Sequence, residues 1–309
     1  MLIDRLIARI KELHAPIVVG LDPRLEQIPH EYKQPFYSEL GKTPKAAAGI
    51  LTAWGRDIID AVDGAAPAIK PQIAMYEQFG PPGIKAYIKT IAYAKSRGLI
   101  VIGDIKRGDI ASTAQSYADG HIGLTQIDGE SRRVFDEDFI TLSPYMGEDS
   151  IAPYLKPCAE HDRGLFILVK TSNPGSAQIQ DTITREGQPL YMRVGQLVSS
   201  WGESFIGNSG FSAVGAVVGA THPKQAADLR KALPHTFFLV PGYGAQGATA
   251  QDLKGVFNKD GIGGIVNSSR GITGAWASPK YSRDFPPGEF AQAARAALLD
   301  MRKDLESAV

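Results

Sequence analysis

Short apolar runs recur along the chain, each bounded by Gly, Pro or a charged residue. Eight of them are four to seven residues long and rich in Val or Ile, as expected for strands that are buried on both faces. The runs cover residues Ile17–Leu21, 66–69, 99–105, Phe139–Leu142, 165–169, 213–218, 237–240 and 262–266. The pattern therefore predicts eight strands of a fully covered sheet.

Longer stretches with helical spacing lie between these runs, and Pro44, Pro189 and Pro223 suit first helical turns, where Pro is favoured. Examples are Pro44–Val62, 82–96, 189–205, Pro223–Ala232 and Phe290–Leu305. Alternating strands and helices imply parallel strands joined by helical crossovers. Eight such units in 309 residues predict an α/β fold, a (β/α)8 TIM barrel with inserted loops and extra helices, as a single domain over residues 1–309. A doubly wound open sheet is the alternative.

Two stretches look like insertions into this barrel. Residues 24–43 are Pro-rich and predicted to be irregular. Residues 172–188 are small and polar, and they follow the fifth strand. A long loop at that end of a barrel is a candidate lid, although a plain surface loop would have the same composition.

Polar residues follow the predicted strands where a barrel carries its active site, at the carboxyl ends. Asp22 follows the first strand, Lys70 the second, and Asp104, Lys106 and Asp109 the third. Because Asp104 and Lys106 are two positions apart on a strand, we expect both side chains on the inner face. Two charges there are costly unless they are paired or functional. A structural ion pair is the alternative, which the nearby Asp22 and Lys70 make less favoured.

The segment 242–247, GYGAQG, matches the dinucleotide fingerprint GxGxxG. It lies late in the chain, however, and lacks the acidic strand end expected about 20 residues further on. We interpret it as an anion cradle, because barrels often bind phosphate in the loops after strands seven and eight. Arg270 can add a bidentate charged contact, although a tight turn with a solvated Arg is the alternative. Together, these residues predict a phosphorylated small-molecule substrate.

The amino-acid composition excludes several other classes of function. Lys+Arg and Asp+Glu both total 33, so we expect no broad basic surface for nucleic acid. The single cysteine, Cys158, leaves no internal disulfide and no Cys-rich zinc site, and the six His show no metal-binding spacing. No apolar run approaches the length of a membrane span, and the charged, amphipathic N-terminus looks like a short helix. We expect a cytoplasmic protein.

The segment DIKRGDI, residues 104–110, resembles the D-x-K-x-x-D signature of orotidine 5′-phosphate decarboxylases. Five further segments resemble the longer bacterial subfamily called type 2, in the same order along residues 17–271. They are GLDPR, AIKPQIAMYE, TLSPYMGEDS, VKTSNPGS and VPGYGAQG. The signature alone is shared with other barrel enzymes that act on sugar phosphates, whereas the ordered set is specific.

This resemblance implies decarboxylation of orotidine 5′-monophosphate to uridine 5′-monophosphate in de novo pyrimidine synthesis, with no metal and no cofactor. It implies a homodimer with composite sites, in which Lys70, Asp104, Lys106 and a partner-derived Asp109 form a catalytic charge array. Lys106 would stabilise a carbanion at C6 and protonate it. The substrate-binding residues would be Asp22 and Lys70 for ribose, Ser172 for pyrimidine, Gln246 and Arg270 for phosphate, and Thr113 from across the interface.

Three other functions stay open. Phosphosugar barrels such as hexulose-phosphate synthase or ketogulonate-phosphate decarboxylase use a divalent metal and typically carry an acidic residue in place of Lys70. A non-catalytic nucleotide-binding barrel would not need a buried Lys106. An NAD-linked oxidoreductase rests only on residues 242–247.

Overall fold

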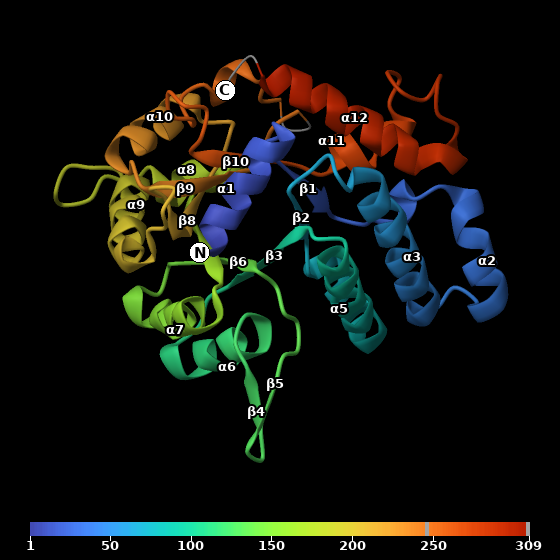
Figure 1. The fold of residues 1–309 in the computed structure, drawn as a ribbon, viewed down its shortest axis with the longest axis horizontal. Helices are drawn as coiled ribbons and strands as arrows, with labels where there is room; N and C mark the ends of the chain where they lie inside the picture. Colours follow the sequence, from blue (N-terminus) through green and yellow to red (C-terminus); the bar gives the residue numbers. More distant parts are fainter. Residues whose placement is uncertain (245–246, 307–309) are drawn as a thin grey trace.

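Eight parallel strands close into a barrel in the computed structural model, which describes residues 1–244 and 247–306 (Figure 1). In chain order the barrel strands are β1 (Ile17–Leu21), β2 (Ala68–Pro71), β3 (Ile100–Arg107), β6 (Phe139–Leu142), β7 (Gly164–Lys170), β8 (Ser212–Val218), β9 (Thr236–Val240) and β10 (Gly264–Ser268). The barrel closes where β1 pairs with β10, with Ile17 opposite Val266. The predicted (β/α)8 fold is confirmed, and the open-sheet alternative is wrong because the first and last strands pair.

The barrel strands are almost entirely buried, as their Val- and Ile-rich composition predicts. All five residues of β1 and all seven residues of β8 are buried. One face of each strand fills the barrel interior and the other packs under the surrounding helices. The ends of the observed strands differ from the predicted runs by no more than two residues.

Helices surround the barrel (Figure 1). They are α1 (Leu2–Leu13), α2 (His30–Leu40), α3 (Pro44–Val62), α4 (Ala74–Glu77), α5 (Gly80–Ser96), α6 (Ala111–His121), α7 (Ala152–His161), α8 (Ala177–Gln180), α9 (Leu190–Trp201), α10 (Pro223–Ala232), α11 (Arg270–Thr273) and α12 (Phe290–Leu305). Thr43 caps α3 by accepting a hydrogen bond from the Ala46 N–H at 3.2 Å, one residue before the helix-starting Pro44. In the described residues, no helix has both the length and the apolar character needed to cross a bilayer.

The prediction that residues 24–43 are irregular is wrong, because this stretch contains helix α2. None of the α2 side chains is fully buried, and Pro35 lies inside the helix, so no apolar period marks it. Its Phe36 side chain packs on α3, where a Cβ on Gly49 would come 3.0 Å from the ring. Helices after the third and fourth strands were expected from the alternation, but the bounds of α6 and α7 were not predicted. The hairpin formed by β4 (Thr125–Ile127) and β5 (Glu130–Arg132) was not predicted at all. The hairpin projects away from the barrel (Figure 1).

Candidate active site

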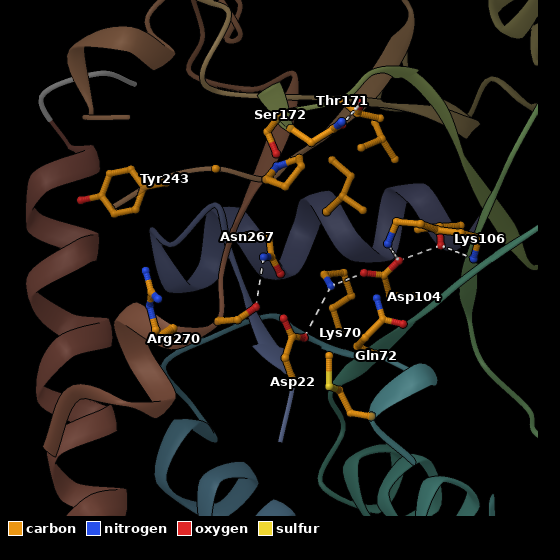
Figure 2. Close-up of a pocket in the computed structure, with 18 of the residues that line it drawn as sticks. Asp22, Lys70, Gln72, Asp104, Lys106, Thr171, Ser172, Tyr243, Asn267 and Arg270 are labelled. Atoms are coloured by element: carbon orange, nitrogen blue, oxygen red, sulfur yellow. Dashed lines mark hydrogen bonds and ion pairs between the residues drawn. The ribbon is translucent and has the colours of Figure 1, made fainter. Parts of the chain in front are cut away.

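A cavity of about 930 Å³ opens at the carboxyl ends of the barrel strands. Its lining comes from the ends of β1, β2, β3, β6, β7, β8, β9 and β10 and from the loops that follow several of them (Figure 2). A volume of this size holds a small-molecule ligand. The cavity lies at the end of the barrel where the strand-end polar residues were expected.

Four charged side chains alternate in sign along one wall of the cavity (Figure 2). Lys70 Nζ donates to Asp104 Oδ2 at 2.6 Å and lies 4.0 Å from Asp22 Oδ1. Lys106 Nζ donates to the other carboxylate oxygen of Asp104, Oδ1, which also accepts from the Thr141 hydroxyl at 3.0 Å. Asp104 therefore holds two ammonium groups at once.

Each charged group of this cluster stabilises the ionised form of its neighbours. Burial alone would raise the pKa of the Asp104 carboxyl, but the positive charges of Lys70 and Lys106 outweigh it and hold that pKa well below its ordinary value. Burial alone would lower the pKa of Lys70, but the charges of Asp104 and Asp22 raise it above its ordinary value. Both members of this buried pair are therefore ionised at neutral pH.

Lys106 has an unusual backbone conformation. Its φ is +45°, in the left-handed region that non-glycine residues seldom occupy. The pairing of β3 with β6 shifts register between Gly103 and Arg107, and the Lys106 N–H donates to Thr141 Oγ1 at 3.0 Å. The Lys106 side chain is 45% exposed, whereas that of Asp104 is 8% exposed. Strained backbone of this kind often occurs at functional sites, and here it accompanies an ammonium group that lines the cavity.

Arg270 and Tyr243 lie across the cavity from Lys106 (Figure 2). Arg270 is the first residue of α11, directly after β10, and Tyr243 follows β9. In the turn after β9, the Gly244 N–H donates to the Ala248 carbonyl at 2.8 Å and the Gly247 N–H to the Gly244 carbonyl at 2.9 Å. These two N–H groups therefore donate to main-chain carbonyls of the same turn. Gln246, predicted to bind phosphate, lies outside the described residues.

The structure brings six of the nine predicted site residues together around the cavity: Asp22, Lys70, Asp104, Lys106, Ser172 and Arg270. Asp109 and Thr113 are not among the described residues that line it. Asp109 is half-buried and accepts a hydrogen bond from the Ile110 N–H at 2.8 Å, and Thr113 is exposed on the first turn of α6. The cavity of one chain thus lacks these two predicted contributions.

Several polar residues of the cavity were given no role from the sequence, among them Gln72, Thr141 and Asn267. Within the described part of the chain, the buried Asn267 Oδ1 has no hydrogen-bond partner, and neither has Asp22 Oδ1. Unpaired buried acceptors are costly, so these two oxygens suit a ligand that carries hydroxyl donors. A Cβ on Gly20 would lie 3.0 Å from Asn267 Oδ1. The position of Asn267 in the polar segment at the end of the eighth strand was the available signal.

No group of three or more His, Cys, Asp or Glu side chains that could hold a metal ion occurs in the described ranges. The lone Cys158 is buried, and burial raises the pKa of its thiol.

A closed (β/α)8 barrel with a charged cavity at the carboxyl ends of its strands is the architecture of barrel enzymes. The chain belongs to the Orotidine 5′-phosphate decarboxylase / HUMPS family, whose sequence model matches residues 16–282.

Individual relatives span the whole chain. The orotidine 5′-phosphate decarboxylase of Rhodopirellula baltica is 43% identical over 288 residues, which cover 93% of each chain. That of Clostridium tetani is 41% identical over 309 residues, covering 100% of this chain and 99% of the relative. The solved structure of Leishmania donovani OMP decarboxylase has a TM-score of 0.70 at 30% identity, over 98% of this chain and 99% of that one.

Proposed function

We propose that this chain decarboxylates orotidine 5′-monophosphate to uridine 5′-monophosphate in de novo pyrimidine synthesis. The observation that supports this most directly is the arrangement of charge in one cavity. The Lys70–Asp104–Lys106 cluster lies at one end, and Arg270 lies at the other (Figure 2). A nucleotide presents a matching pair of features, a reacting base and a distant phosphate. The names of the relatives point to the same reaction.

In the proposed reaction the bond between C6 and the carboxylate breaks, carbon dioxide leaves and the electron pair stays on C6. The Lys106 ammonium stabilises this carbanion and donates a proton to it. The resulting neutral amine then regains a proton from water. The proposal needs no metal and no cofactor, because a protein cation meets the developing negative charge.

Proton donation is a small part of the acceleration that this reaction needs. One positioned acid contributes roughly 10²–10⁴-fold. The rest must come from charge that is already in place and from binding energy at the distant phosphate. Asp104 supports the first contribution, because its hydrogen bonds to Lys70, Lys106 and Thr141 hold the Lys106 ammonium before substrate arrives.

A spectrophotometric assay with orotidine 5′-monophosphate in the presence of EDTA tests this proposal. Wild type should turn over, Lys106→Ala should lose activity, and the control Lys280→Ala, which removes an exposed lysine, should match wild type. Activity that disappears in chelator would favour a metal-dependent phosphosugar enzyme. An active Lys106→Ala variant would remove Lys106 from the mechanism.

We also propose a type 2 enzyme in the cytoplasm that works as a homodimer with composite sites, in which Asp109 and Thr113 reach the neighbouring cavity. Both residues lie outside their own cavity on the β3–α6 segment. Large apolar side chains are exposed on the same segment and on the loop after β6: Ile110 at 55%, Tyr145 at 85% and Met146 at 45%. An exposed apolar patch beside two unused site residues suits contact with a second copy.

Subunit complementation tests the composite site. Lys106→Ala and Asp109→Ala should each be inactive alone. Mixed in equal amounts and allowed to exchange subunits, they should regain about one quarter of wild-type activity. Half of the dimers are then heterodimers, and each heterodimer has one intact site out of two. No recovery, together with a monomeric mass in sedimentation, would refute the shared site.

A further inference from the structure

Lys170, the last residue of β7, is a buried cation that the proposed mechanism does not use. Its side chain is 0% exposed, and it is not among the described residues that line the cavity. The pairing of β7 with β8 shifts register between Leu168 and Lys170. Lys170 Nζ donates to Asp181 Oδ1 at 2.7 Å and to Ser176 Oγ at 3.4 Å, and it lies 5.7 Å from the centre of the Tyr191 ring. A cation buried this completely is costly unless it is paired and hydrogen-bonded, as Lys170 is here.

The next residue, Thr171, makes a matching pair of contacts. Its N–H donates to Gln180 Oε1 at 3.0 Å, and its hydroxyl accepts from Gln180 Nε2 at 2.8 Å. Two consecutive residues at the end of β7 are therefore bound to two consecutive residues at the end of α8, Gln180 and Asp181. Ser172 begins the loop between them.

The main chain of Ser172 is also held from β8. A Cβ on Gly219 would lie only 2.8 Å from Ser172 Cα, so the absence of a side chain there lets the two segments touch. The Thr221 hydroxyl donates to the Ser172 carbonyl at 3.2 Å, and the Gly219 N–H donates to the Lys170 carbonyl at 2.7 Å. Ser172 is thus fixed on both sides before any ligand is present.

We propose that the Lys170–Asp181 ion pair, together with the Thr171–Gln180 contacts, is a clamp that positions Ser172 toward the pyrimidine of the substrate. Lys170 and Asp181 are then positioning residues. The clamp ties together the two ends of the loop that contains Ser172 in the free protein. The target of Ser172 rests on the proposed function, whereas the clamp itself does not.

The variant Asp181→Asn tests the clamp. It removes the carboxylate partner of the buried Lys170, which can cost about 3–5 kcal/mol, so urea unfolding first checks that the variant is folded under the assay conditions. We expect kcat/KM for orotidine 5′-monophosphate to fall about ten-fold, mostly through KM, since Asn keeps an acceptor oxygen but loses the charge that strengthens the bond to Lys170. Asp300→Asn is the matched control: it breaks a surface pair of the same 2.7 Å length and should leave both constants unchanged.

A double-mutant cycle separates positioning from general damage. If Asp181 acts through Ser172, the combined variant Ser172→Ala/Asp181→Asn should be no worse than Ser172→Ala alone. Losses that multiply would overturn the proposal. Asp181→Glu, which keeps the charge, should restore part of the affinity, and no restoration would count against the ion pair.

Hydrogen exchange in the free protein tests the clamp independently of any activity assay. The Thr171 amide should be protected in wild type and in Asp300→Asn, and it should exchange at least ten-fold faster in Asp181→Asn. Unchanged protection would refute the clamp. If wild type proved inactive on orotidine 5′-monophosphate while the exchange result held, the proposed function would fail and the clamp would stand.

Discussion

The substitution Asp104→Asn removes the anion that Lys70 and Lys106 share while keeping the shape of the side chain. Lys70 then remains 6% exposed, with Asp22 at 4.0 Å as its remaining carboxylate. Removing one partner of a buried ion pair costs about 3–5 kcal/mol. Because Asn keeps one acceptor oxygen and Asp22 remains, we expect a loss near the lower limit, about 3 kcal/mol of unfolding free energy at neutral pH.

The difference in unfolding free energy between wild type and Asp104→Asn should shrink as the pH falls. Above the ordinary carboxyl pKa of 3.8, Asp104 is ionised in both the folded and the unfolded chain, so the full contribution of the pair is present. Below that value the unfolded chain binds a proton that the folded chain does not bind. Wild type then loses up to about 1.4 kcal/mol per pH unit from this group, and the gap between wild type and variant narrows.

Urea unfolding followed by the fluorescence of the three Trp residues measures both quantities. Curves at neutral pH, near pH 4 and near pH 3 should show the gap closing as acid is added. Asp300→Asn serves as the surface control and should cost less than about 1 kcal/mol. A gap below 1 kcal/mol at neutral pH, or one that stays constant into acid, would refute the buried-pair reasoning.

Three further outcomes are expected. Arg270→Ala should raise KM for orotidine 5′-monophosphate about 10- to 100-fold and leave reaction of the phosphate-free nucleoside nearly unchanged; equal losses on both substrates would contradict a phosphate role. Gly219→Ala should cost about 1–3 kcal/mol in urea unfolding and lower kcat/KM, because its Cβ would overlap Ser172, whereas Gly288→Ala, with nothing within 4 Å, should do neither. Trypsin should cleave after the exposed Arg185, and uridine 5′-monophosphate should slow that cleavage; equal rates would count against a lid.

Helix prediction worked where an apolar face repeats and failed where it does not. The Pro44–Val62 helix was predicted with its observed ends, because it has a Thr cap, a Pro at its start and a buried stripe. Helix α2 buries none of its side chains fully, so its sequence carries no such stripe.

The sequence predicted those site residues that directly follow an apolar run. Asp22, Lys70, Asp104, Lys106, Ser172 and Arg270 line the cavity as expected, while their roles stay predictions. Lys170 also ends a strand, but the register shift before it turns it to Asp181, and no local pattern marks such a shift.

The sequence by itself determined the eight alternating strands and helices and the order of polar residues at the strand ends, because burial on both faces demands continuous apolar runs. Only the tertiary structure decided which of those residues meet. Closure of β1 on β10 brings Gly20 against Asn267 and Ser269, and the contact of β3 with β6 places Thr141 against Asp104. These contacts join residues far apart in the chain, and their geometry depends on barrel closure and register, which no local pattern encodes.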